Sequence, residues 1–330
     1  MCPNLDRLQS EITLAQTKIF KDPVLNTALI ASVDLGGTKV RGAICLLDGT
    51  ILAETTEPTD PSGGTAVIQQ IASLIKKIAR DSAVGSHALT MAVIGTPGVP
   101  NLETGTITQA PNIANLDQIN FRQNLSDQLG VPALLENDVN LAAVGEHWLG
   151  NPSKCDNLVY LSVGTGIGAG IIIDGKLYRG TSGLAGQVSL LPFGADPFEG
   201  ESLRSGALER VAATAAIVRS YQQATTLKST VPEVIELANA GNDAAIEALN
   251  CACLQIARAI ISTVVIVDPE VLVLGGSIGN RSEIRRRIVD YAVRLSSKPI
   301  NLRSTCLDQN APILGGVRLA HLHFQPISSR

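Results

Sequence analysis

Apolar positions recur along this chain with two different periods, which predicts strands alternating with helices. Short apolar runs bounded by glycine or other turn residues predict strands at 28–33, 40–47, 51–55, 89–94, 133–135, 158–163, 169–173, 177–179 and 271–274. Longer segments with apolar residues three and four positions apart predict helices at 65–80, 117–129, 140–149, 206–221, 231–240, 243–264 and from 311 through 321. The alternation favours an α/β fold.

One part of this pattern occurs twice. Residues 33–52 read VDLGGTKVRGAICLLDGTIL and residues 160–178 read YLSVGTGIGAGIIIDGKLY, so that Gly42 aligns with Gly168 and Asp48 with Asp174. Each copy reads as strand, glycine-rich turn, strand, Asp-Gly turn and strand, and Asp-Gly is typical of a two-residue hairpin. Two such copies predict two similar lobes facing a shared cleft, with a boundary near residue 140.

The glycine-rich turns carry the first candidate chemistry. A strand that ends in glycines presents bare backbone N–H groups, which suit phosphate oxygens. In the first turn Asp34 can hold Mg²⁺ directly or through water, while Thr38 offers a hydroxyl and Lys39 a cation. Glycines that merely permit positive φ explain one such turn alone, but two related turns favour phosphate binding. Neither turn fits a P-loop or a dinucleotide fingerprint, because a strand rather than a helix follows each.

A second constellation, Glu136-Asn137-Asp138, stands between a short apolar strand and a helix. Asp138 could be a plain helix N-cap. Because ligands gather at strand ends in α/β sheets, we interpret it instead as a carboxylate that accepts a proton from an attacking hydroxyl during phosphoryl transfer. Two weaker signals are Gly275-Gly276, where a flat ring could lie against the backbone, and Asn112, which could bind a hydroxylated ligand or form a turn with Pro111.

Composition narrows the class of protein. With 330 residues, 45% apolar and 17% charged, the chain can form two well-packed domains. A net charge of −4 and 3% aromatic residues argue against nucleic-acid partners. The six cysteines are scattered, which indicates core packing in a reducing compartment, and this includes Cys251 and Cys253. We find neither a secretory signal nor an apolar run long enough for a membrane span, and therefore expect a cytoplasmic protein without a membrane partner.

The motifs, in their order and spacing, resemble the ROK family of sugar kinases. They are DLGGTK at 34–39, GTPG at 95–98, APN at 110–112, ENDVN at 136–140, GTGIGAG at 164–170 and DPEVLVLGG at 268–276. The resemblance runs from about residue 29 to residue 322. It implies the two-domain actin/hexokinase/Hsp70-like (ribonuclease H-like) ATPase fold, with ATP and Mg²⁺ in the cleft. The implied parts are an N-terminal extension (1–28), an N-terminal domain (29–139), a C-terminal domain (140–310) and a helix (311–330) that returns to the first domain.

The resemblance also implies site residues. Asp138 would be the catalytic base. ATP and its magnesium would contact the residues of both turns and the later glycine pair, namely Asp34, Gly36, Gly37, Thr38, Lys39, Gly164, Thr165, Gly166, Gly275 and Gly276. The sugar would contact Asn112, Asn137, Asp138, Gln187 and Glu201.

The chain departs from the family at one segment. ROK kinases usually carry a glutamate and a histidine here, followed by a cysteine cluster that binds structural zinc with that histidine. This chain has Gln187 and Leu190 at those positions, and no Cys or His occurs from Gln187 to Glu201. Because zinc requires thiolate or imidazole ligands, we predict no structural zinc.

Two functions are compatible with a chain that keeps the phosphate and base motifs of the family but departs from it at the segment from Gln187. We favour ATP-dependent phosphorylation of a hexose, with glucose as the first choice and fructose, mannose or N-acetylmannosamine as alternatives. The other reading is a non-catalytic ROK-type sugar sensor that acts through a protein partner. ROK-type repressors carry a DNA-binding domain ahead of the core, and residues 4–20, which we expect to form an amphipathic helix, are too few for one. A homodimer is left open.

Overall fold

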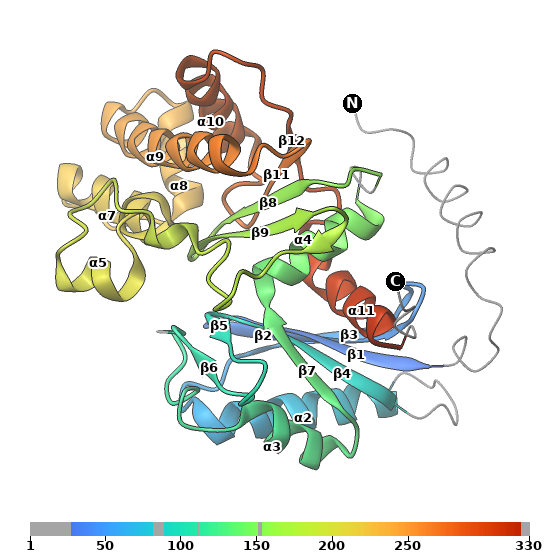
Figure 1. Cartoon of the computed structure of the whole chain (residues 1–330). Coiled ribbons are helices and arrows are strands. Elements are labelled where there is room, and N and C mark those ends of the chain that lie inside the picture. Colours follow the sequence, from blue (N-terminus) through green and yellow to red (C-terminus); the bar gives the residue numbers. More distant parts are fainter. Residues whose placement is uncertain (1–27, 82–88, 111, 151–153, 325–330) are drawn as a thin grey trace.

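The computed structural model describes residues 28–81, 89–110, 112–150 and 154–324 and contains two five-stranded sheets with one topology (Figure 1). In the first sheet the strand order is β3-β2-β1-β4-β7, and in the second it is β10-β9-β8-β11-β12. In each, the two central parallel strands are flanked by an antiparallel hairpin on one side and a further parallel strand on the other. The internal near-repeat therefore corresponds to two structural copies. The helix expected at 4–20 lies outside the described residues.

The predicted strands lie close to their expected positions, whereas β12 and the short β5–β6 hairpin were not predicted. The first sheet contains β1 (Leu29–Leu35), β2 (Lys39–Leu46), β3 (Ile51–Pro58), β4 (Leu89–Thr96) and β7 (Ala133–Asn137). The second contains β8 (Leu158–Val163), β9 (Ile167–Ile173), β10 (Lys176–Leu177), β11 (Val271–Gly275) and β12 (Leu302–Ser304). A short hairpin, β5 (Val99–Pro100) and β6 (Ile107–Thr108), lies beside the first sheet.

Helices cover both sheets. The N-terminal lobe has α2 (Gly64–Asp81) and α3 (Phe121–Leu129) on one face of its sheet, and the C-terminal lobe has α5 (Gly200–Ser205), α6 (Glu209–Ala212), α7 (Thr214–Thr225), α8 (Val231–Asn239), α9 (Asp243–Val267) and α10 (Ser282–Leu295). The helices α4 (Asp138–Leu149) and α11 (Ala311–Phe324) lie between the two sheets (Figure 1). They frame the region where the lobes meet.

The two middle helices cross at glycines. A Cβ on Gly315 would lie 1.8 Å from the carbonyl oxygen of Leu141, and one on Gly145 would lie 2.1 Å from that of Ala311. Only glycine allows the two backbones to approach this closely. Because α4 leads from β7 to β8 and α11 follows β12 and packs on β1, this crossing fixes one lobe against the other.

Helix α9 is long and apolar enough, by length and composition, to cross a membrane. Its residues Ala252, Ile256 and Ile260 are fully buried among α7, α8 and α10. We therefore describe α9 as the central core helix of the C-terminal lobe. Cys253 on this helix is buried as predicted, whereas Cys251 is exposed, so the prediction that both cysteines are buried is wrong for Cys251.

Three local predictions differ from the structure. The helix expected at 206–221 begins only at Glu209, since Gly206 with a φ of 95° ends α5, and it is divided at Ala213, which is extended between α6 and α7. Helix α10 was not predicted, although Ile284, Ile288 and Ala292 line its buried face. Asp174-Gly175 forms the expected two-residue hairpin, with φ of 50° and 69°, but the turn at Asp48-Gly49 is longer and closes between Leu46 and Thr50.

Candidate functional site

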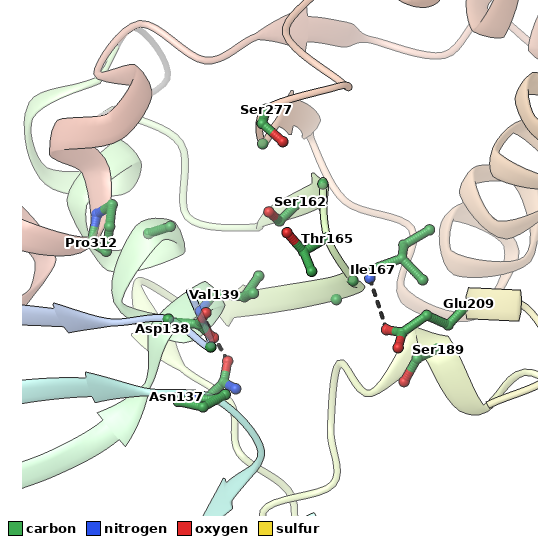
Figure 2. A pocket seen from close by; sticks show the side chains of 18 of the residues that line it. Asn137, Asp138, Val139, Ser162, Thr165, Ile167, Ser189, Glu209, Ser277 and Pro312 are labelled. Atoms are coloured by element: carbon green, nitrogen blue, oxygen red, sulfur yellow. Dashed lines mark hydrogen bonds between the residues drawn. The ribbon is translucent and has the colours of Figure 1, made fainter. Parts of the chain in front are cut away.

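A cavity of about 670 Å³ lies between the lobes, and residues of both glycine hairpins line it. Figure 2 shows Asp138 and, from the second hairpin, Thr165 among the side chains that line this cavity. Most of the predicted site residues line this cavity, namely Asp34, Gly36, Gly37, Thr38, Lys39, Asn112, Asn137, Asp138, Gly164, Thr165, Gly166, Gln187 and Gly276. They come from both copies of the repeat. A cavity of this size is within the range of small-molecule sites.

The first hairpin joins β1 to β2 through Gly36, Gly37 and Thr38. The turn closes with a 2.9 Å hydrogen bond from the N–H of Gly36 to the carbonyl of Lys39. The Thr59 hydroxyl donates to the Gly36 carbonyl at 2.7 Å, which ties the turn to the end of β3. A side chain on Gly37 would lie 2.7 Å from Cβ of Asn112. Glycine at 37 therefore lets Asn112 approach the turn.

The second hairpin joins β8 to β9 through Gly164, Thr165 and Gly166. Its turn closes with a 2.8 Å bond from the Gly164 N–H to the Gly166 carbonyl. Backbone N–H groups at such turns, with the Thr165 hydroxyl, can contact an anion at the cavity wall.

Asp138 is the first residue of α4 and lies on the cavity wall. The helix N-cap is Asn137, whose Oδ1 accepts from the N–H groups of Val139 and Asn140 at 3.0 and 3.1 Å. The alternative that Asp138 merely caps the helix is therefore wrong. Since the neighbouring residue does the capping, the Asp138 carboxylate keeps one edge toward the cavity, while its Oδ1 accepts from Val139 N at 2.9 Å.

Burial, and next the negative charge of Asp34, raise the pKa of Asp138 to about 7. Burial likewise raises the pKa of Asp34, partly offset by the positive charges of Lys39 and Arg41. A carboxyl group with a pKa near neutrality is suited to take up and release a proton under physiological conditions. Two mutually repelling carboxyl groups on one wall also fit a divalent cation, which would relieve the repulsion. Among the described residues, no group of three or more His, Cys, Asp or Glu is placed to hold a metal by itself.

Two predicted residues are not brought to the cavity wall. Gly275 is buried, and a Cβ there would lie 2.1 Å from the Tyr160 hydroxyl, so that Tyr160 and Gly276 line the wall instead. Glu201 does not line the cavity either, and its carboxylate lies 3.4 Å from Arg210. Gly275 faces away from the cavity because alternate residues of a strand face opposite ways. Glu201 does not reach the cavity because it is on the exposed side of the short helix α5.

Glu136 and Arg179, which were not predicted as site residues, support Asp138. Glu136 is buried, and its Oε1 accepts from Asn137 N at 3.0 Å and from Asn140 Nδ2 at 2.9 Å. Its Oε2 pairs with Arg179 Nε at 2.6 Å, which joins the end of β7 to the loop after β10. This network orients the first turn of α4. A buried acid next to a predicted site residue was the available sequence signal, but its partner Arg179 lies in a distant segment.

The segment between β12 and α11 is held from both lobes. Buried Arg41 of the first hairpin donates to the Gln309 carbonyl and to Asn310 Oδ1, each at 2.6 Å. From α4, the buried carboxylate of Glu146 accepts from the Thr305 hydroxyl and from the N–H groups of Cys306 and Leu307. Sequence reasoning missed both residues, since each contact spans more than 150 positions.

Comparison with known proteins supports the predicted family. The ROK family model matches residues 30–323. A glucokinase from Thermotoga maritima is 29% identical over 313 residues, covering 88% of this chain and 96% of that protein. A xylose repressor from Caldicellulosiruptor bescii is 37% identical over 122 residues, which is 37% of this chain and 30% of the repressor.

Solved structures give the same result. The crystal structure of a ROK hexokinase from Thermus thermophilus superposes with a TM-score of 0.76 at 30% identity, covering 89% of this chain and 98% of that one. A ROK family glucokinase from Streptomyces griseus in complex with glucose and AMPPNP superposes with a TM-score of 0.74 at 24% identity, covering 89% and 100%. The fold is therefore that of the two-domain ROK kinases, and the family model spans most of the sequence. This chain belongs to the ROK family.

Proposed function

We propose that this protein is an ATP-dependent sugar kinase that transfers the terminal phosphoryl group of ATP to a hydroxyl of a hexose, with glucose as the first choice. The observation that carries the proposal is the placement of Asp138 on the same cavity wall as both glycine hairpins. The Thermotoga relative and the Thermus structure are a glucokinase and a ROK hexokinase, which supports this class of reaction.

In this proposal the two hairpins hold the phosphates and Asp138 is the general base. The backbone N–H groups near Gly37, Thr38 and Thr165 bind phosphate oxygens from the two lobes. The ionised Asp138 accepts the proton of the sugar hydroxyl, while the hydroxyl oxygen attacks the terminal phosphorus and the bond to the bridging oxygen of ADP breaks. After transfer the proton rests on Asp138, whose pKa near 7 allows it to return to solvent.

Magnesium fits the residues present. Asp34 would hold it, directly or through water, because its buried carboxylate lies on the wall beside the first hairpin. When bound, the ion neutralises charge on the phosphates. We retain as predictions the absence of structural zinc, the domain boundaries at 28/29, 139/140 and 310/311, and the cytoplasmic location. Whether the protein forms a homodimer is left open.

The sugar side of the site differs from the ROK pattern. Gln187, Ser189 and Leu190 line the cavity, and Asn112 and Asn137 lie near the first hairpin and Asp138. Gln187 can donate and accept hydrogen bonds to sugar hydroxyls, whereas Leu190 offers only apolar contact. Asn137 already donates to the Gly98 carbonyl at 2.9 Å and caps α4, which leaves it one donor for a sugar. The pairing of Glu201 with Arg210 does not favour its predicted sugar contact.

A coupled ADP-release assay tests the proposal. Wild-type protein with MgATP should phosphorylate at least one sugar in a panel of glucose, fructose, mannose and N-acetylmannosamine. Asp138→Asn should turn that sugar over about 10² to 10⁴ times more slowly than the wild type. The similarity to part of a xylose repressor makes a sugar sensor the competing function. Detectable sugar binding without ADP release across the whole panel would overturn the kinase proposal in favour of that sensor.

A further inference from the structure

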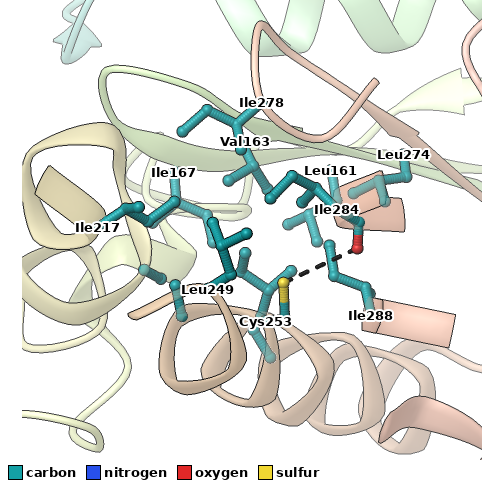
Figure 3. Close-up of a cluster of buried hydrophobic side chains, with 14 of the residues drawn as sticks. Leu161, Val163, Ile167, Ile217, Leu249, Cys253, Leu274, Ile278, Ile284 and Ile288 are labelled. Carbon is teal, nitrogen blue, oxygen red and sulfur yellow. Dashed lines mark hydrogen bonds between the residues drawn. The ribbon is translucent and has the colours of Figure 1, made fainter. Parts of the chain in front are cut away.

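One loop of the C-terminal lobe crosses to the N-terminal lobe. The strand β9, which precedes it, belongs to the core of the C-terminal lobe, where Ile167 packs beside Ile217 (Figure 3). After β10 the chain reaches toward β5 of the other lobe (Figure 1), and a Cβ on Gly183 would lie 2.9 Å from Cγ1 of Val99. We call residues 179–185 the crossing loop.

The crossing loop ends at the sugar side of the cavity. Its two ends meet, because the N–H of Ala185 donates to the Arg179 carbonyl at 3.2 Å. Gln187, which lines the cavity, donates through its N–H to the carbonyl of Leu184 at 3.1 Å. The position of Gln187 at the cavity therefore depends on the position of the loop.

A buried ion pair joins the crossing loop to the turn that bears Asp138. Arg179 Nε donates to Glu136 Oε2 at 2.6 Å, and the Glu136 side chain is only 3% exposed. The other oxygen of Glu136 accepts from Asn137 N and Asn140 Nδ2, so one carboxylate contacts both the loop and the first turn of α4. Among the residues that the structure describes, no other hydrogen bond links the crossing loop to the N-terminal lobe.

The crossing loop has little rigidity of its own. Gly180 and Gly183 have φ of 70° and 78°, and glycines lose the most conformational freedom when they are ordered. A buried carboxylate, in contrast, is costly to leave without its charged partner, so Glu136 retains Arg179. The ion pair therefore supplies the order that the glycines lack.

We propose that Arg179 is a positioning residue for the sugar, because its ion pair with Glu136 holds the crossing loop, and with it Gln187, against the turn that carries Asp138. The inference rests on the proposed function, which supplies a sugar as the ligand on this side of the cavity. Neither Arg179 nor Glu136 lines the cavity, so both act through their neighbours. Loss of the pair should weaken sugar binding and leave nucleotide binding unchanged, because its described hydrogen bonds do not involve the turns at 36–38 and 164–166.

Isothermal titration with glucose and, separately, with MgAMPPNP tests the proposal; fructose, mannose or N-acetylmannosamine replaces glucose if the wild type binds that sugar instead. Arg179→Met should weaken sugar binding about tenfold, because a loop that is free in the unbound protein must be ordered when the sugar binds. Its affinity for MgAMPPNP should not change. Arg179→Lys should restore part of the sugar affinity, since it keeps the charge but not the guanidinium geometry. Lys176→Met, which removes an exposed cation of β10, is the matched control.

Hydrogen exchange in the ligand-free protein gives a readout that needs no sugar. In Arg179→Met the amides of residues 180–190 should exchange faster than in the wild type, while those of 36–38 and 164–166 should not change. Combining Arg179→Met with Glu136→Gln should add little to either effect, because both variants break the same bond. The double variant leaves no unpaired buried charge, so it keeps the test available if Arg179→Met is unstable.

Three results separate the inference from its alternatives. Wild-type sugar affinity and exchange rates in folded Arg179→Met would overturn it, and would show that the bond from Ala169 N to the Gly186 carbonyl is enough to hold Gln187. Equal losses of sugar and MgAMPPNP affinity would also overturn it, because Arg179 would then support the fold as a whole. Wild-type protein that binds no sugar of the panel would refute the proposed function, while faster exchange at 180–190 in Arg179→Met would still support the holding of this segment by the ion pair.

Discussion

Replacing Asp138 with Asn should reduce turnover by orders of magnitude and stabilise the fold. The pKa of Asp138 is raised from 3.8 to about 7 by burial and by Asp34. Between these values the folded state binds more protons at this site than the unfolded state, so wild-type stability falls as pH rises from about 4 to about 7. At about 1.36 kcal/mol for each pKa unit, the ionised carboxylate costs at most about 4 kcal/mol above pH 7. The actual cost is lower, because one edge of the group faces the open cavity.

Asn keeps the hydrogen bond from Val139 but carries no charge and cannot act as a base. The variant and the wild type should therefore have similar stability at pH 4. As pH rises to 7 the wild type loses stability, so the variant should become increasingly more stable than the wild type. Its turnover should fall by about 10² to 10⁴, with sugar affinity retained. Urea unfolding at pH 4, 5, 6 and 7, together with ADP release, measures both effects. A stability difference that does not change with pH, or turnover near the wild-type value, would refute the reasoning.

The other predictions concern pH, packing, a buried acid and zinc. The wild-type kcat/KM should fall about tenfold per unit below about pH 7 as Asp138 is protonated; a flat profile from pH 5 to 8 would remove Asp138 as the base. Gly315→Ala should cost about 3 kcal/mol or more in urea unfolding, because its Cβ meets the Leu141 carbonyl, while Gly200→Ala should change little. Glu146→Ala should cost about 3 kcal/mol by leaving buried donors unpaired, and equal stability with the exposed control Glu236→Ala would contradict this. A zinc-specific chelator should leave the melting temperature unchanged, and a large fall would reveal a missed metal.

The sequence was most informative where physical constraints are local. Glycine turns between apolar strands and the Asp-Gly pair at 174–175 predicted the hairpins of both lobes, because turn geometry depends on a few adjacent residues. The near-repeat then predicted two copies of one topology, which the sheets confirm. Asp138 could be singled out because polar residues at a strand end commonly face a ligand.

Contacts between distant segments could not be predicted. Arg179 meets Glu136 and Thr305 meets Glu146 only after the lobes are assembled. Glu209 lies within a segment expected to be one helix, whereas helix α6 begins at Glu209 and ends before Ala213, and the contact of Glu209 with Ile167 spans 42 positions. Helix α10 shows a different failure. Its buried positions at intervals of four were visible in the sequence, but three arginines stand between the first two of them, Ile284 and Ile288, and lower the apolar signal.

The most direct test of the account is a crystal structure with AMPPNP, magnesium and the sugar identified by the panel. The account predicts the terminal phosphate between the turn at 36–38 and the turn at 164–166, with one sugar hydroxyl about 3 Å from the Asp138 carboxylate. Phosphates bound away from either turn, or a sugar whose hydroxyls all lie beyond reach of Asp138, would contradict it.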